Sequence, residues 1–99
     1  MAEFKHENPQ LKFTVPDAIT VRQQLEFYGI ATLMPDREMY LRLWEAAKPL
    51  IQEWECPSIP DYTVFDLDKS DSPDAAQAIV LAGLDVRTHL AKLEKLEKN

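Results

Sequence analysis

Apolar and aromatic residues recur at spacings of three and four from Tyr40 to Trp54, which predicts a helix with one buried face. Pro49 stands inside this segment, where it removes a backbone hydrogen bond and clashes with the carbonyl of Glu45. We therefore expect a kink or a restart of the helix near Lys48. So long an apolar stripe needs other elements of the fold to cover it.

A second helix is predicted after residue 19. Thr20 followed by Gln23 is a capping-box pattern, which starts a helix. Val21, Leu25 and Tyr28 then fall on one face of that helix, because they are four and three residues apart.

A third helix is predicted to begin at Ser72, which caps it, with Pro73 at its first helical position. Its core stripe starts at Ala75 and continues to Leu96. A helix over residues 73–96 is roughly 36 Å long. Its end, rich in lysine and glutamate, is therefore expected to project into solvent or against a neighbour.

The remaining segments complete the predicted fold. Residues 1–10 are polar and are predicted to be a flexible N-terminal tail, and residues 11–99 a single helical domain. Residues 11–15 alternate between apolar and polar, and residues 62–67 have strand propensity, so these two segments are the candidates for a strand pair. The prediction is a mainly α fold: three antiparallel helices with a kinked middle helix, a long C-terminal helix and at most a short two-stranded β element.

The charge of the chain narrows the classes of partner. The formal net charge of −6 argues against nucleic acid and against anionic membrane surfaces, which both require basic residues. The sequence has no apolar run near the ~20 residues that span a bilayer and no signal peptide at its start. Its single cysteine, Cys56, forms no disulfide within the chain. These features are typical of a cytoplasmic protein.

The residues that carry chemistry are few and scattered, so we expect no enzyme activity, no metal and no cofactor. His6, Cys56 and His89 lie far apart in the sequence, without the paired spacing of zinc ligands. Residues 66–71 resemble the start of a calcium loop, but the sixth position lacks its glycine, and the twelfth is Gln77 instead of glutamate. This segment is interpreted as a solvated acidic turn.

Aromatic residues on the middle helix and leucines near the C-terminus are the candidates for binding another protein. Tyr40, Trp44 and Trp54 fall on one broad side of a helix, which is consistent either with a core or with an anchor for a partner. Residues 92–99 form an amphipathic end that is either solvated or paired with a partner helix. The candidate protein-binding residues are Tyr40, Trp44, Leu50, Trp54, Leu93 and Leu96.

Three segments, taken in order, carry a family resemblance. They are Phe13–Pro16 followed by Ile19–Leu25; Leu43–Ile51 followed by Trp54 and Cys56; and Asp66–Asp68 followed by a proline-capped helix that ends in Leu93–Asn99. In order and composition they resemble the small bacteriophage tail assembly chaperones, over most of the chain after residue 12. None of the three contains a catalytic signature, and no functional residue is carried over from the family.

The resemblance implies a non-enzymatic, helical protein in the cytoplasm of the bacterial host. Such chaperones bind the long tape-measure protein during tail morphogenesis and leave before the tail is finished, and some self-associate. The alternative is a small acidic phage or prophage regulatory protein or inhibitor that binds a basic host protein. The acidic residues are scattered among lysines and arginines and do not form a phosphate-like stripe, which favours the chaperone.

Overall fold

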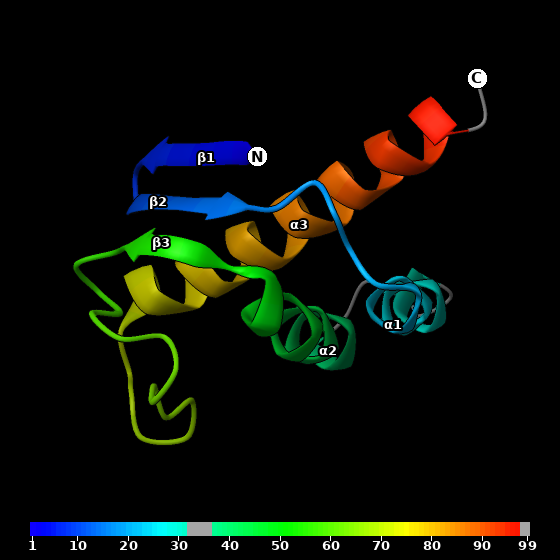
Figure 1. Cartoon of the computed structure of the whole chain (residues 1–99). Coiled ribbons are helices and arrows are strands. Elements are labelled where there is room, and N and C mark those ends of the chain that lie inside the picture. Colours follow the sequence, from blue (N-terminus) through cyan, green and yellow to red (C-terminus); the bar gives the residue numbers. More distant parts are fainter. Residues whose placement is uncertain (32–36, 98–99) are drawn as a thin grey trace.

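The chain forms a three-stranded antiparallel sheet and three α-helices within the residues that the computed structural model describes, 1–31 and 37–97 (Figure 1). The strands are β1 (Ala2–Glu7), β2 (Gln10–Val15) and β3 (Gln52–Glu55), in the order β1-β2-β3. The protein is therefore a mixed α/β fold, and the prediction of a mainly α protein was wrong.

Residues 1–10, which we predicted to be a flexible tail, contain strand β1 and a turn. Phe4 and His6 are half-buried and alternate with exposed charged residues, which is the period of a strand with one covered face. Asn8 and Pro9 form the turn, and Glu7 is opposite Gln10 across it. The polar composition of this segment concealed its alternation, because only two of its residues face inward with bulky side chains.

Strand β2 confirms the extended segment predicted at residues 11–15, but its partners differ from the prediction. Leu11, Phe13 and Val15 are fully buried, and β2 pairs with both β1 and β3. Residues 62–67 lie in the loop between β3 and α3. The hydroxyl of Tyr62 there donates a hydrogen bond to the carbonyl of Ile51, 2.9 Å away.

The helices are α1 (Val21–Ala31), α2 (Arg37–Ala47) and α3 (Pro73–Glu97), with a short 3-10 turn at Lys48–Leu50. The capping box at α1 is confirmed: Thr20 Oγ1 accepts from the Gln23 amide at 3.2 Å, and Gln23 Oε1 accepts from the Thr20 amide at 3.0 Å. The cap of α3 is confirmed as well, since Ser72 Oγ accepts from the Ala75 amide at 3.2 Å.

We predicted that the middle helix kinks or restarts near Lys48 and runs on to Trp54. Helix α2 instead ends at Ala47. Pro49 lies in the 3-10 turn, and Ile51 then adopts an extended backbone with φ −74° and ψ 134°. The chain leaves the helix there and enters β3. Proline therefore terminated the helix, and Trp54 came to lie on a strand.

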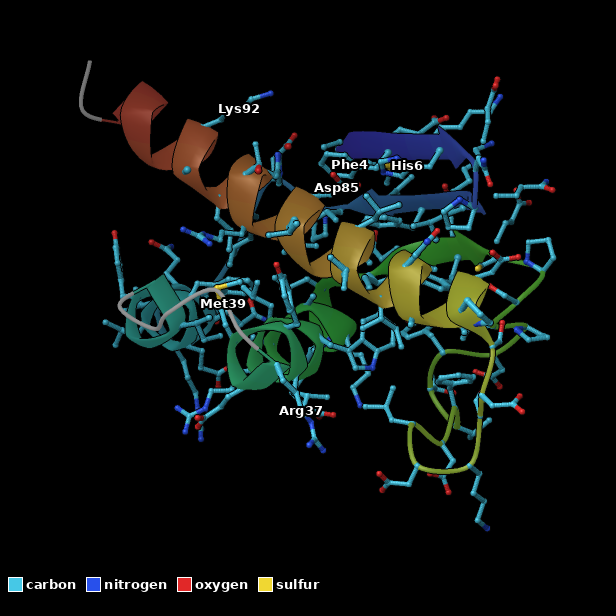
Figure 2. All side chains as sticks on the ribbon, turned by 180° about the vertical axis from the view of Figure 1, so that it is seen from behind. Phe4, His6, Arg37, Met39, Asp85 and Lys92 are labelled. Carbon is cyan, nitrogen blue, oxygen red and sulfur yellow. The ribbon has the colours of Figure 1, made fainter. Side chains whose placement is uncertain are left out.

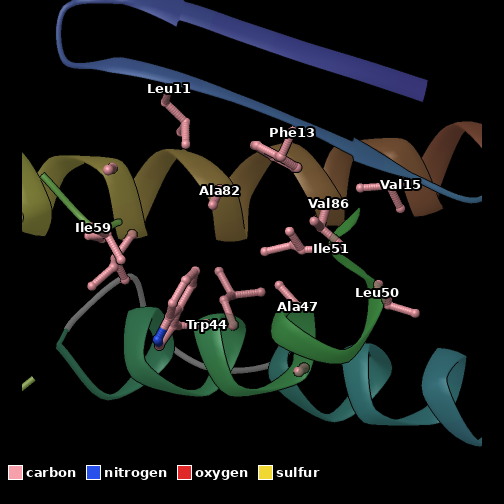
Figure 3. Close-up of a cluster of buried hydrophobic side chains, with 14 of the residues drawn as sticks. Leu11, Phe13, Val15, Trp44, Ala47, Leu50, Ile51, Ile59, Ala82 and Val86 are labelled. Atoms are coloured by element: carbon pink, nitrogen blue, oxygen red, sulfur yellow. The ribbon is translucent and has the colours of Figure 1, made fainter. Parts of the chain in front are cut away.

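The core lies where β2, α2 and α3 meet (Figure 3). Trp44 from α2 and Val86 from α3 are almost completely buried there beneath Phe13 of β2. Helices α2 and α3 approach closely at Gly83, where an added Cβ would lie 3.0 Å from the Cβ of Leu43. Helix α1 packs on α2, and the C-terminal end of α3 extends beyond the rest of the molecule (Figure 1).

Across the described ranges, the helices lack the combination of length and apolar character that crossing a bilayer requires. The side chains of Leu93 and Leu96 lie outside those that the structure describes, although the backbone of α3 continues to Glu97.

Candidate protein-binding surface

Helix α1 carries apolar side chains on two opposite faces. Phe27 and Ile30 face the protein and are 7% and 5% exposed. Val21, Leu25 and Tyr28 face outward and are 71%, 61% and 50% exposed. We call these three residues the α1 stripe. An exposed row of apolar side chains on a helix whose opposite face is already packed marks a surface suited to a partner.

The α1 stripe is fixed in position by the polar contacts at the start of the helix. The capping box sets the first turn, and Gln24 Nε2 donates to the carbonyl of Ile19 at 2.9 Å. The buried Phe27 and Ile30 then fix the rotation of the helix about its axis. The outward direction of the stripe therefore follows from where the inner face packs.

A groove of about 580 Å³ lies between α1 and α2, beside the face that carries Glu26. Ile30 and Ala46 form its apolar floor, and Leu41, at 37% exposed, forms part of its wall. Its charged rim is formed by Glu26, Glu38, Arg42 and Glu45. The groove and the α1 stripe therefore lie on the same helix, and both present apolar side chains to solvent.

The acidic residues of this rim are partly neutralised by neighbours. Arg42 donates to Glu38 at 2.8 Å, and Lys48 lies 3.0 Å from Glu45. The first pair lies on the exposed face of α2, and the second joins α2 to the 3-10 turn that follows it; ion pairs at such solvent-accessible positions contribute little to stability. They do not form the array of unpaired carboxylates that would imitate a nucleic acid.

Of the aromatic residues proposed as partner anchors, Trp44 and Trp54 lie side by side at the core. Trp44 is 1% exposed and Leu50 3%, so neither contributes to the surface. Trp54 is half-buried, with ring centroids 5.8 Å from Trp44 and 5.2 Å from Tyr62, and its Nε1 donates to the carbonyl of Ile59 at 2.7 Å. Tyr40 packs half-buried against the core.

Comparison with protein-family models, with curated proteins and with solved structures finds no match for this chain.

The α1 stripe is the feature that sequence reasoning did not recognise as a surface. Its periodicity was evident, but Phe27 and Ile30 fall on the opposite face of the same helix. This second apolar face was the available signal, because only one face of a helix packs against its own small core.

The two histidines connect the N-terminal segment to α3. His6 Nε2 lies 2.6 Å from a carboxylate oxygen of Asp85 (Figure 2). His89 Nε2 lies 3.6 Å from a carboxylate oxygen of Asp17. His89 is buried. A hydrogen bond from the amino group of Met1 holds the pKa of Asp17 below its usual value, and the charge of His89 acts in the same direction. These contacts join β1 and the segment after β2 to one face of α3.

The acidic segment at residues 66–71 forms a turn. The carboxylate of Asp66 accepts the amide of Asp68 at 2.9 Å, and its side chain lies 3.9 Å from the amino group of Lys69. In the described ranges, no three histidine, cysteine, aspartate or glutamate side chains gather as a possible metal site.

Proposed function

We propose that this protein is a non-enzymatic tail assembly chaperone of a bacteriophage, which acts in the cytoplasm of the bacterial host. It binds the tape-measure protein before the tail tube closes around that client. The observation that carries the proposal is the exposure of the α1 stripe on a helix whose other face is already packed. The choice of the tape-measure protein as the client rests on the resemblance of the three segments to the tail assembly chaperones.

The chemistry of the α1 stripe suits an apolar helical client. A long tape-measure helix exposes apolar residues at intervals of three and four until assembly covers them, and such a helix packs along another helix. Two or three anchors of about 2 kcal/mol each would supply much of the roughly −8 kcal/mol that corresponds to a micromolar dissociation constant. Affinity in this range keeps the complex reversible, as a chaperone that leaves the finished tail requires.

Co-expression with the tape-measure protein encoded by the same phage tests the proposal. The client should be soluble and co-purify with this protein, and it should precipitate when expressed alone. A client that is equally insoluble in both cases would refute the proposal. The position of the gene provides an inexpensive check, because a tail chaperone is expected just upstream of a very long, helical open reading frame.

A pair of matched variants locates the binding surface. Leu25→Asp places a charge in the α1 stripe, where it should weaken client binding at least about tenfold. Val64→Asp places the same charge on a loop side chain that is 76% exposed, and it should leave binding unchanged. Both positions are exposed, so both variants should fold.

Salt separates the chaperone from an acidic inhibitor that binds a basic host protein. Apolar binding through the α1 stripe should persist in high salt, whereas binding by carboxylates is screened. The pairing of Glu38 with Arg42 and of Glu45 with Lys48 favours the chaperone, since these acids already have cationic neighbours.

A further inference from the structure

Strand β1 forms an open edge of the sheet. Its one side pairs with β2 through six consecutive residue pairs from Ala2 to Glu7, and within residues 1–31 and 37–97 no strand pairs with its other side. Figures 1 and 2, which view the protein from opposite sides, both place β1 at the outer margin of the sheet. Backbone groups on that margin are a template for another strand.

The edge of β1 is regular and is held from one face. Phe4 stacks on Phe13 with ring centroids 5.2 Å apart, and His6 is bonded to Asp85 of α3. Among residues 2–7 there is neither a proline nor a break in register, which are two of the devices that block an edge. Its other face presents Glu3, Lys5 and Glu7, all exposed, so the order of these charges decides which strand fits.

The charges of β1 are self-complementary in one antiparallel register. A two-fold axis at Phe4 places Glu3 opposite the partner's Lys5, and Lys5 opposite the partner's Glu3, with the two phenylalanines adjacent. An axis at Lys5 instead places two lysines opposite each other and Glu3 opposite Glu7. An axis at His6 also places opposite charges across from each other, but only residues 5–7 of each strand then overlap. The axis at Phe4 gives the longer overlap, residues 2–6 of each strand.

We propose that β1 pairs with β1 of a second copy of this chain, antiparallel and centred on Phe4, to form a continuous six-stranded sheet. The pairing satisfies open backbone groups of both edges and covers the half-buried Phe4. A strand of this length buries less than the roughly 800 Å² per partner of a stable interface, so the dimer forms reversibly with concentration. The α1 stripe lies on a different element, so the dimer does not depend on the proposed function.

Sedimentation velocity over a concentration series tests the dimer. The wild-type protein should shift from 11.4 kDa towards twice that mass as its concentration rises. Glu3→Lys and Lys5→Glu should each raise the dissociation constant about tenfold, because each turns two attractive cross-strand pairs into repulsive ones. An equimolar mixture of these two variants should associate as the wild type does, since their charges complement each other in the register centred on Phe4.

Asp71→Lys is the matched control, because it makes the same change of charge as Glu3→Lys at an exposed residue of the loop before α3. It should dimerise as the wild type does. A wild-type protein that stays at 11.4 kDa at every concentration would overturn the proposal. A Glu3→Lys variant that dimerises more tightly would overturn it too, because that result indicates the axis at Lys5. Failure of the mixture to associate, with every variant shown by circular dichroism to be folded, would exclude the charge pairing.

Discussion

Replacing Tyr62 by phenylalanine removes a single hydroxyl group and leaves the ring in place. That hydroxyl donates to the carbonyl of Ile51 at 2.9 Å, and Ile51 is only 3% exposed. The ring lies 5.2 Å from Trp54 and 6.4 Å from Trp44 between centroids, and these contacts persist in the variant. Tyr62→Phe therefore isolates the hydrogen bond that ties the long loop to the start of β3.

The expected loss of stability follows from the burial of the acceptor. A hydrogen bond contributes about 0.5–1.5 kcal/mol net, and leaving its buried partner unsatisfied costs up to about 3 kcal/mol. The Ile51 carbonyl belongs to an almost fully buried residue, so we expect the free energy of unfolding to fall by about 1–2 kcal/mol. In a domain of this size that is a decrease in Tm of roughly 4–16 °C.

Urea denaturation followed by tryptophan fluorescence measures this difference, because Trp44 and Trp54 both lie in or against the core. Tyr40→Phe is the control: it removes the same group from a half-buried tyrosine on α2 and should change stability by less than about 0.5 kcal/mol. Equal stability of the two variants would refute the reasoning that the hydroxyl of Tyr62 holds the loop.

Three further substitutions test other parts of the fold. Ser72→Ala removes the cap of α3 and should lower the free energy of unfolding by about 1 kcal/mol in urea. Gly83→Ala gains about 1 kcal/mol of helix propensity but meets the Cβ of Leu43, which costs about 1–3 kcal/mol, so the variant should be no more stable than the wild type; a gain of stability would contradict the close approach of α2 and α3. Hydrogen bonds from the side chain and amide of Thr63 hold the pKa of Asp61 below its ordinary value of 3.8, so its contribution is present above that pH and is lost as pH falls through the lowered pKa. Asp61→Asn should therefore lose less stability than the wild type on acidification below about pH 4, and parallel losses in an acid titration would contradict the role of Thr63.

Local signals in the sequence predicted the starts of the helices well, and long-range pairing poorly. The caps at Thr20 and Ser72 depend on residues only three positions apart, and both were confirmed. The sheet depends on contacts between residues far apart, such as Thr14 with Gln52. The spacing of the apolar residues on both sides of Pro49 suggested one continuous helix face. Trp54 does pack against the same core as Trp44, but it does so from strand β3, and helical spacing cannot distinguish the two cases.

The candidate site could be predicted only in part, for a related reason. Periodicity places Val21, Leu25 and Tyr28 on one face of α1, but it cannot say which face of a helix packs inward when both are apolar. Phe27 and Ile30 occupy the inner face in the folded protein. The large aromatic residues proposed as anchors are the ones that fill a small core most effectively, which explains the burial of Trp44.

The most direct test of client binding at the α1 stripe is whether the client protects the stripe from chemical labelling. Cysteine introduced by Val21→Cys, and separately by Val64→Cys, can be labelled with a maleimide at positions that are 71% and 76% exposed, while the native Cys56 is buried. With saturating tape-measure protein, labelling at position 21 should slow at least about tenfold and labelling at position 64 should not change. Labelling of position 21 at the same rate in the formed complex would show that the client binds elsewhere.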